Sequence, residues 1–151
     1  MFPHTVTVYN ITQGTDSATF EDTEKAYITV LRGVLLEASK AVNVRESGLE
    51  GADAVNLYIP FAVEAVDGVT GKRKTYTGPI HFWSAEDKDS LWTLSTTGNG
   101  GVTLFVKGEV VVPDATQQRL EAAYDDVYAV TKVDAKDYGS ADMQHWEVGG
   151  A

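Results

Sequence analysis

The sequence predicts an all-β fold, a small antiparallel β-barrel or sandwich with long inter-strand loops and one short helix. Two observations predict it: many short segments alternate apolar and polar residues, and glycine, asparagine, aspartate or proline separates them at intervals of roughly ten residues. With 151 residues, 43% of them hydrophobic, the chain is long enough for one sizeable core. We therefore expect residues 1–151 to form a single barrel-like domain, and a βαβ enzyme fold is disfavoured.

The first predicted strand runs from Thr5 to Ile11, which is rich in β-branched residues and places Val6 and Val8 on one face. The following Thr12 to Lys25 has no apolar period, which predicts an exposed loop.

Tyr27 to Leu36 is the most apolar segment and predicts a central strand. Gly33 within it predicts a bulge or a tight bend, as at the corner of a small barrel. Glu37 to Asp53 contains glycines and small residues, which predict a long excursion between strands, and Val42 to Arg45 could add a short strand to it.

Ala54 to Pro60 alternates again, with Val55, Leu57 and Ile59 on one side of a predicted strand. Another strand is expected from Phe61 to Val66. Turn residues at 67–71 then predict a hairpin with the Lys74 to Tyr76 region.

Ser84 to Asp89 could form one helical turn, with Ser84 as its N-cap. Leu91 to Ser95 and Val102 to Val112 predict two strands joined through the glycine-rich residues 97–101.

The best helix candidate begins at Asp114, with Gln117 at capping-box spacing and with Leu120 and Tyr124 on one face. Two further alternating strands, Asp126 to Val133 and Met143 to Val148, close the chain.

Composition excludes several classes of function. The chain has no cysteine, which excludes disulfides, thiolate nucleophiles and cysteine-ligated zinc. Its 12 basic and 22 acidic side chains give a formal charge of -10, which disfavours binding to a phosphate backbone but suits a surface that DNA slides past. No apolar run long enough to span a bilayer and no signal-like start are present, so we expect a soluble protein kept inside the cell until release.

The histidines, His4, His81 and His145, are far apart in the sequence. His145 and Glu147 share one face of a predicted strand, which makes half of a zinc or acid–base site; a surface pair or interface contact is the favoured interpretation.

Gly98 to Gly101 lacks the Lys-Ser/Thr of a P-loop and predicts a hairpin turn. Neither Ser47 nor Ser95 sits in a nucleophile elbow, and the many carboxylates are typical of a solvated acidic face. We therefore predict no enzyme, no cofactor and no metal site.

The three tryptophans, Trp83, Trp92 and Trp146, could stack on a sugar or anchor a protein partner, although core packing is the commoner role. Trp146 lies among polar neighbours that suit an interface rim.

Four stretches taken together, His4 to Asn10, Val30 to Leu36, Val44 to Val55 and Asp137 to Val148, resemble an uncharacterised family of small proteins encoded in phages and prophages of Gram-positive bacteria. The layout of a strand, a bent strand, a long loop and further strands is also similar to head-closure and head-tail joining proteins of long-tailed phages.

The resemblance implies a virion structural protein, assembled in the bacterial host cytoplasm. It would be a neck subunit that forms a homo-oligomeric ring between the portal or adaptor and the tail, without specific nucleic-acid or membrane binding, and that could line the DNA channel. A tail-terminator, minor capsid or decoration protein is the alternative within the virion, and a carbohydrate-binding module is the alternative of another class.

One set of contact residues follows from the resemblance, and a second follows from the polar neighbours of Trp146. The candidate subunit or channel loop comprises Val44, Arg45, Glu46, Ser47, Gly48, Leu49 and Glu50, with Arg45 as its strongest ion-pairing residue. The candidate C-terminal interface comprises His145, Trp146 and Glu147.

Overall fold

The computed structural model describes residues 2–15, 22–39, 54–96, 101–113 and 115–151. Two helices and nine strands are assigned in these ranges. The strands are β1 (His4–Thr15), β2 (Asp22–Ser39), β3 (Ala54–Pro60), β4 (Glu64–Asp67), β5 (Thr75–Tyr76), β6 (Leu91–Trp92), β7 (Gly101–Lys107), β8 (Val127–Lys136) and β9 (His145–Gly150). The helices are α2 (Pro79–Ser84) and α3 (Gln117–Ala123).

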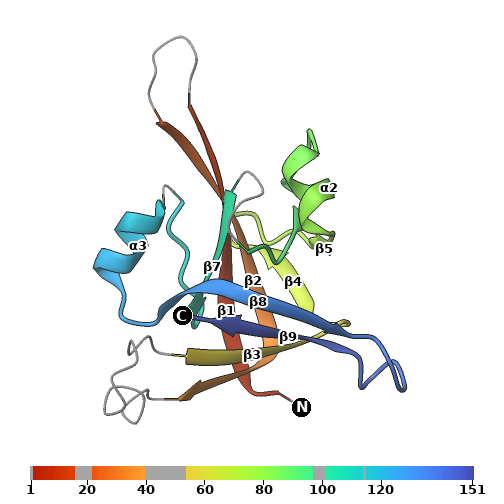
Figure 1. Cartoon of the computed structure of the whole chain (residues 1–151). Helices are drawn as coiled ribbons and strands as arrows, with labels where there is room; N and C mark the ends of the chain where they lie inside the picture. The colour runs from red at the N-terminus through yellow and green to blue at the C-terminus, as the bar shows by residue number, and fades with distance from the viewer. Residues whose placement is uncertain (1, 16–21, 40–53, 97–100, 114) are drawn as a thin grey trace.

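Antiparallel pairing closes the main sheet into a barrel (Figure 1). β1 pairs with β2 and β7, β7 pairs with β8, β8 pairs with β9, β9 pairs with β3, and β3 returns to β2. β4 is added along β2. The predicted all-β antiparallel class is confirmed, with a second short helix where one was expected.

Two bent strands make the corners of the barrel. Arg32 pairs with Thr5 and Val34 with His4, so Gly33, with a φ of 90°, is the extra residue of a bulge. The register of β8 shifts between Val130 and Lys132. The bends divide the barrel into sheet A (β1, β7, β4 and the first parts of β2 and β8) and sheet B (β3, β9 and the second parts of β2 and β8). The bend predicted at Gly33 is confirmed.

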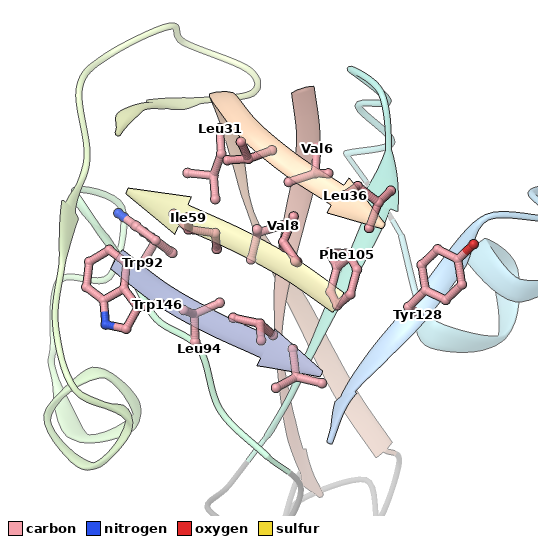
Figure 2. Packing of buried hydrophobic residues seen from close by; sticks show 14 of the residues in the cluster. Val6, Val8, Leu31, Leu36, Ile59, Trp92, Leu94, Phe105, Tyr128 and Trp146 are labelled. Atoms are coloured by element: carbon pink, nitrogen blue, oxygen red, sulfur yellow. The ribbon is translucent and has the colours of Figure 1, made fainter. Parts of the chain in front are cut away.

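Apolar side chains of both sheets fill the barrel (Figure 2). Val6 and Val8 of β1 point inward together, as their alternation predicts, and Leu57 and Phe105 are likewise fully buried. Trp92 and Trp146 close the packing on one side of this core.

A second apolar core lies on the outer side of sheet A. Tyr9 and Ile11 of β1 and Leu104 of β7 pack there with Leu120 of α3. Burial of a leucine such as Leu120 contributes about 1.5–3 kcal/mol, which holds the short helix in place despite its length. β7 is therefore buried on both faces, which explains why it is apolar almost throughout.

A network of hydrogen bonds between buried polar side chains and the backbone joins the segment after α2 to β1. The Asn10 amide nitrogen donates to the Thr93 carbonyl and to Thr103 Oγ1, both at 2.9 Å, and the amide oxygen of Asn10 accepts from the Thr93 N–H at 3.3 Å. All three residues are buried, so the network satisfies groups that would be costly without partners.

The exposed loop predicted over 12–25 is wrong at both ends. β1 continues to Thr15 and β2 begins at Asp22, and the two strands form a ribbon that projects beyond the barrel (Figure 1). Pairing of β1 with β7 ends at Thr12. Pairing through backbone groups needs no apolar period in the sequence, so the pattern of residues 12–25 did not predict it.

The helix expectations need two corrections. Ser84 ends α2 rather than starting a helix over 84–89; its hydroxyl donates to the Ile80 and His81 carbonyls, and Pro79 supplies the preset φ of the first turn. Thr116, not Asp114, is the N-cap of α3, because Thr116 Oγ1 accepts from the Arg119 N–H at 3.2 Å. Asp114 itself lies outside the described residues. No helix in the described ranges is long and apolar enough to cross a membrane.

Three strand predictions are also corrected. The strand expected over 61–66 is β4, shifted to 64–67 and paired with β2. The hairpin expected with 74–76 is reduced to one antiparallel bridge between Val66 and Arg73, because Thr75–Tyr76 pairs in parallel with Leu91–Trp92. β7 ends at Lys107, short of the expected end at residue 112. The next residue, Gly108, adopts a φ of 90°.

Candidate functional site

The alternation of β9 separates the predicted C-terminal interface into two environments. His145 and Glu147 lie on the outer face of sheet B, whereas Trp146 points into the barrel. His145 Nε2 lies 3.2 Å from Glu147 Oε1, and His145 Nδ1 lies 2.8 Å from the Met143 carbonyl. The pair predicted from two-residue spacing therefore exists as a contact.

Trp146 belongs to an aromatic cluster in the barrel core. Its ring centroid lies 4.3 Å from that of Tyr76, 4.5 Å from that of Phe61 and 5.6 Å from that of Trp92. Only 8% of Trp146 is exposed. The expectation of Trp146 at an interface rim does not fit this position, because strand alternation turns the indole away from the polar residues beside it in the sequence.

The outer face of sheet B around His145 is polar. Tyr58 of β3 lies beside His145, with 6.1 Å between ring centroids. On the β8 side, Asp134 pairs in register with Glu147 and Lys136 with His145. Unlike sheet A, this face has no helix packed over it in the described ranges. It can form hydrogen bonds and ion pairs with a partner.

The chemistry available at this face is limited. His145 and Glu147 supply two metal ligands, and no group of three His, Cys, Asp or Glu side chains suited to a metal occurs among the described residues. A general acid–base site would also need a cleft that excludes water around the pair, and neither His145 nor Glu147 lines the three pockets found beside β2 and β4. The geometry favours a contact surface.

The predicted loop residues Val44 to Glu50 lie outside the described residues. The strands that flank them are described: Ser39 at the end of β2 pairs directly with Ala54 at the start of β3. Val55 pairs with Gly150, so the Ser39–Ala54 pair lies beside the C-terminal end of β9. His145, at the other end of β9, pairs with Pro60. The Ser39–Ala54 pair and His145 are thus separated by the length of β9, roughly 17 Å at the rise of an extended strand.

A pocket of about 540 Å³ lies between the first half of β2 and the turn after β4. Its lining combines apolar and charged residues: Lys25, Ala26, Tyr27, Ile28, Asp67, Val69, Thr70, Lys72, Arg73, Asp87, Asp89, Ser90 and Pro113. Sequence reasoning missed this pocket. The signal was present as Lys72-Arg73-Lys74, three consecutive cations in an acidic chain.

Lys74, next to the pocket, has a buried side chain. Its ammonium donates to the Ile28 carbonyl at 3.2 Å and lies 3.9 Å from Asp67 Oδ2. Burial lowers the pKa of Lys74, while the charges of Asp67 and Asp89 oppose that shift. The two carboxylates therefore compensate a cation inside the fold.

The three tryptophans offer no open stacking platform. Trp92 and Trp146 are buried, and Trp83 is partly covered. Trp83 Nε1 donates to Ser95 Oγ at 3.2 Å, and its ring packs against Gly101, where an added β-carbon would stand 2.6 Å from Trp83 Cη2. A carbohydrate-binding site built on these residues is therefore disfavoured.

Fold and surface define a closed antiparallel β-barrel with one covered sheet, one polar open sheet face and projecting hairpins. The chain belongs to the family of unknown function DUF6751, whose model matches residues 1–151. No curated protein and no solved structure matches it.

Proposed function

We propose that this chain is a structural subunit of a tailed-phage virion, and specifically a head-closure or head-tail connector subunit that assembles as a ring between portal or adaptor and tail. The observation that carries the proposal is a closed barrel from which paired strands project on different sides (Figure 1). Projecting hairpins give one small domain several separate places to contact neighbours, as a subunit in a ring requires.

Two further features support the proposal. The open face of sheet B carries hydrogen-bonding and charged groups around His145, which suit a polar protein contact. The formal charge of -10 suits a ring through which DNA passes, because an acidic surface repels phosphate. The proposal assigns no catalysis to the chain, and its partners are copies of itself, the portal or adaptor, and the tail.

The alternatives within the virion are a tail-terminator, a minor capsid protein and a decoration protein. Each of these roles could be filled by a small barrel of this kind, so only the position of the chain in the particle distinguishes them. No observation favours a carbohydrate-binding module over these.

The test is to purify particles of the phage or induced prophage that encodes this chain, identify the chain by mass spectrometry, and reconstruct the neck by cryo-electron microscopy without imposed identity. Density for the barrel in a ring between portal and tail supports the connector role. Density on the capsid shell or along the tail overturns the connector role and keeps the virion role. Absence of the chain from intact particles overturns both.

A further inference from the structure

One edge of β2 has no strand beside it where it borders the pocket of about 540 Å³. β1 pairs with β2 on one side as far as Asp22, whereas β4 pairs on the other side only from Thr29 to Arg32 (Figure 1). The stretch from Lys25 to Ile28 therefore has an open edge among the described residues, and all of its residues line the pocket. An open edge is a ready template for a further strand.

The hydrogen bonds of β2 show which backbone groups face the pocket. The Ile28 carbonyl points away from β1, because it accepts the Gly68 N–H at 3.1 Å and the Lys74 ammonium at 3.2 Å. Alternate residues of an antiparallel strand direct their N–H and C=O groups to the same side, so those of Ala26 also face the open edge. Within the described ranges, neither these groups of Ala26 nor the Ile28 N–H has a partner on that side. Ala26 is half-buried and Ile28 is buried, where unpaired backbone groups are uncommon.

The turn after β4 keeps this edge open. Asp67 Oδ1 accepts the N–H groups of Val69 and Thr70 at 2.7 and 3.1 Å, which bends the chain as soon as β4 ends. Gly68 makes the last backbone contact with β2, and the chain then turns away. β4 therefore leaves the part of β2 around Ala26 without a neighbouring strand, and the cause is the local sequence of the turn.

Charge does not choose an occupant for this pocket, but backbone pairing does. Carboxylates and cations balance in its lining, which contains Asp67, Asp87, Asp89, Lys25, Lys72 and Arg73. The open N–H and C=O groups of Ala26 are the pattern that an extended polypeptide satisfies. A residue placed directly opposite Ala26 would share its face of the sheet, and that face borders the second apolar core beside Val111. This position therefore favours an apolar side chain.

We infer that the open edge of β2 is a binding site for an extended polypeptide segment of a partner protein. The segment pairs antiparallel with residues 25–28 in line with β4, accepts the Ala26 N–H, donates to the Ala26 carbonyl and places an apolar side chain opposite Ala26. In strand addition of this kind, main-chain hydrogen bonds supply affinity and alternate side chains supply specificity. The inference goes beyond the proposed function and does not depend on where the chain lies in a particle.

Peptide binding to the full chain tests the site. Hexapeptides are selected from a random displayed library on the immobilised chain, and a labelled peptide is measured by fluorescence anisotropy. N-methylation at a peptide position whose N–H faces β2 should weaken binding about tenfold, because it removes one main-chain hydrogen bond. N-methylation at the positions between should change affinity by less than about twofold. Failure to select a binding peptide, or the absence of this alternation, would overturn the inference.

Ala26→Pro supplies the measurement on the protein side. It removes the N–H at an edge position, where proline is tolerated, and should weaken the same peptide about tenfold. Ala26→Ser keeps the N–H and is the matched control, with thermal unfolding as the check that both variants fold. Unchanged affinity in Ala26→Pro would overturn the inference.

Amide exchange in the natural chain decides the question if Ala26→Pro does not fold. Measured by NMR, the bound peptide should slow exchange of the Ala26 amide about tenfold or more and leave the amides of α3 unchanged. No slowing at Ala26 would overturn the inference.

Discussion

The backbone of Gly150 lies directly against the ring of Phe105: a β-carbon at Gly150 would stand 2.6 Å from Phe105 Cζ and 3.0 Å from Val55 Cγ2. Phe105 is fully buried in the barrel core, so neither ring nor strand has room to move. Gly150→Ala should lower the free energy of unfolding by about 1–3 kcal/mol, measured by urea denaturation. Gly78→Ala is the control, because nothing lies within 4 Å of its β-carbon position and its φ of -63° suits alanine. Equal stability of the two variants would contradict the packing described.

Gly33→Ala tests the corner of the barrel by a different mechanism. No atom lies within 4 Å of the added β-carbon, but the φ of 90° is a conformation that alanine rarely adopts. The cost expected is about 1–2 kcal/mol, from backbone strain alone. Because Gly33→Asn tolerates positive φ better, it should recover part of the loss in the same denaturation assay. An unchanged midpoint for Gly33→Ala would show that the bulge can rearrange.

Tyr9 should make the fold sensitive to alkaline pH. Its hydroxyl donates to the Val110 carbonyl and accepts the Val112 N–H at 3.0 Å, and burial raises its pKa from 10.0 to about 12. A group whose pKa is higher in the folded state contributes stability that is present below pH 10 and is lost as the pH rises from 10 to about 12. The full loss is on the order of 3 kcal/mol, because the pKa rises from 10.0 to about 12 and one pKa unit corresponds to about 1.4 kcal/mol.

Comparison of unfolding curves at several pH values between 9 and 12 checks this expectation. Tyr9→Phe should remove the alkaline dependence that Tyr9 causes, although it loses the two hydrogen bonds at neutral pH. Tyr138→Phe, at a side chain that is 71% exposed, should leave the dependence as in the natural chain. The same alkaline slope in Tyr9→Phe would exclude Tyr9 as its source.

Substitutions at His145 and Trp146 should differ in their effect on stability, because one side chain lies on the surface of β9 and the other in the core. Trp146→Ala removes a buried ring from the aromatic cluster and should cost about 3–5 kcal/mol. His145→Ala removes a partly exposed pair with Glu147 and should change stability by less than about 1 kcal/mol. Thermal unfolding measures both. Under the virion role proposed above, and if the outer face of sheet B contacts a partner, His145→Ala should weaken incorporation into phage particles at unchanged stability. A comparable loss of stability in both variants would refute the assignment of faces.

The alternation of apolar and polar residues predicted the strands that have one face in the barrel core. Val6 and Val8, and Val55, Leu57 and Ile59, all point into the barrel as their alternation indicates, and β3 spans the predicted range. The ribbon residues 12–15 and 22–25 were mistaken for loop, because pairing of backbone groups leaves no trace in side-chain polarity. For the same reason the parallel pairing of β5 with β6 was missed.

The candidate site was likewise predicted in part from local pattern and in part not. The contact of His145 with Glu147 was predicted from their spacing, because alternate residues of a strand share a face. Which face meets the core was not visible in Met143 to Val148, so Trp146 was expected near the surface and lies in the barrel. The pocket beside β2 joins residues 25–28, 67–73 and 87–90, which are far apart along the chain.

The sequence by itself determined the all-β class, the acidic surface, the absence of cysteine chemistry and the bend at Gly33, because each depends on composition or on neighbours along the chain. Only the tertiary structure decided that the sheet closes on itself, and that α3 packs on sheet A while no described helix packs on the outer face of sheet B. It also decided that Lys25, Lys72 and Arg73 line one pocket. The physical reason is that these features arise from contacts between distant segments, whose partners are chosen by packing of the whole barrel and not by any local pattern.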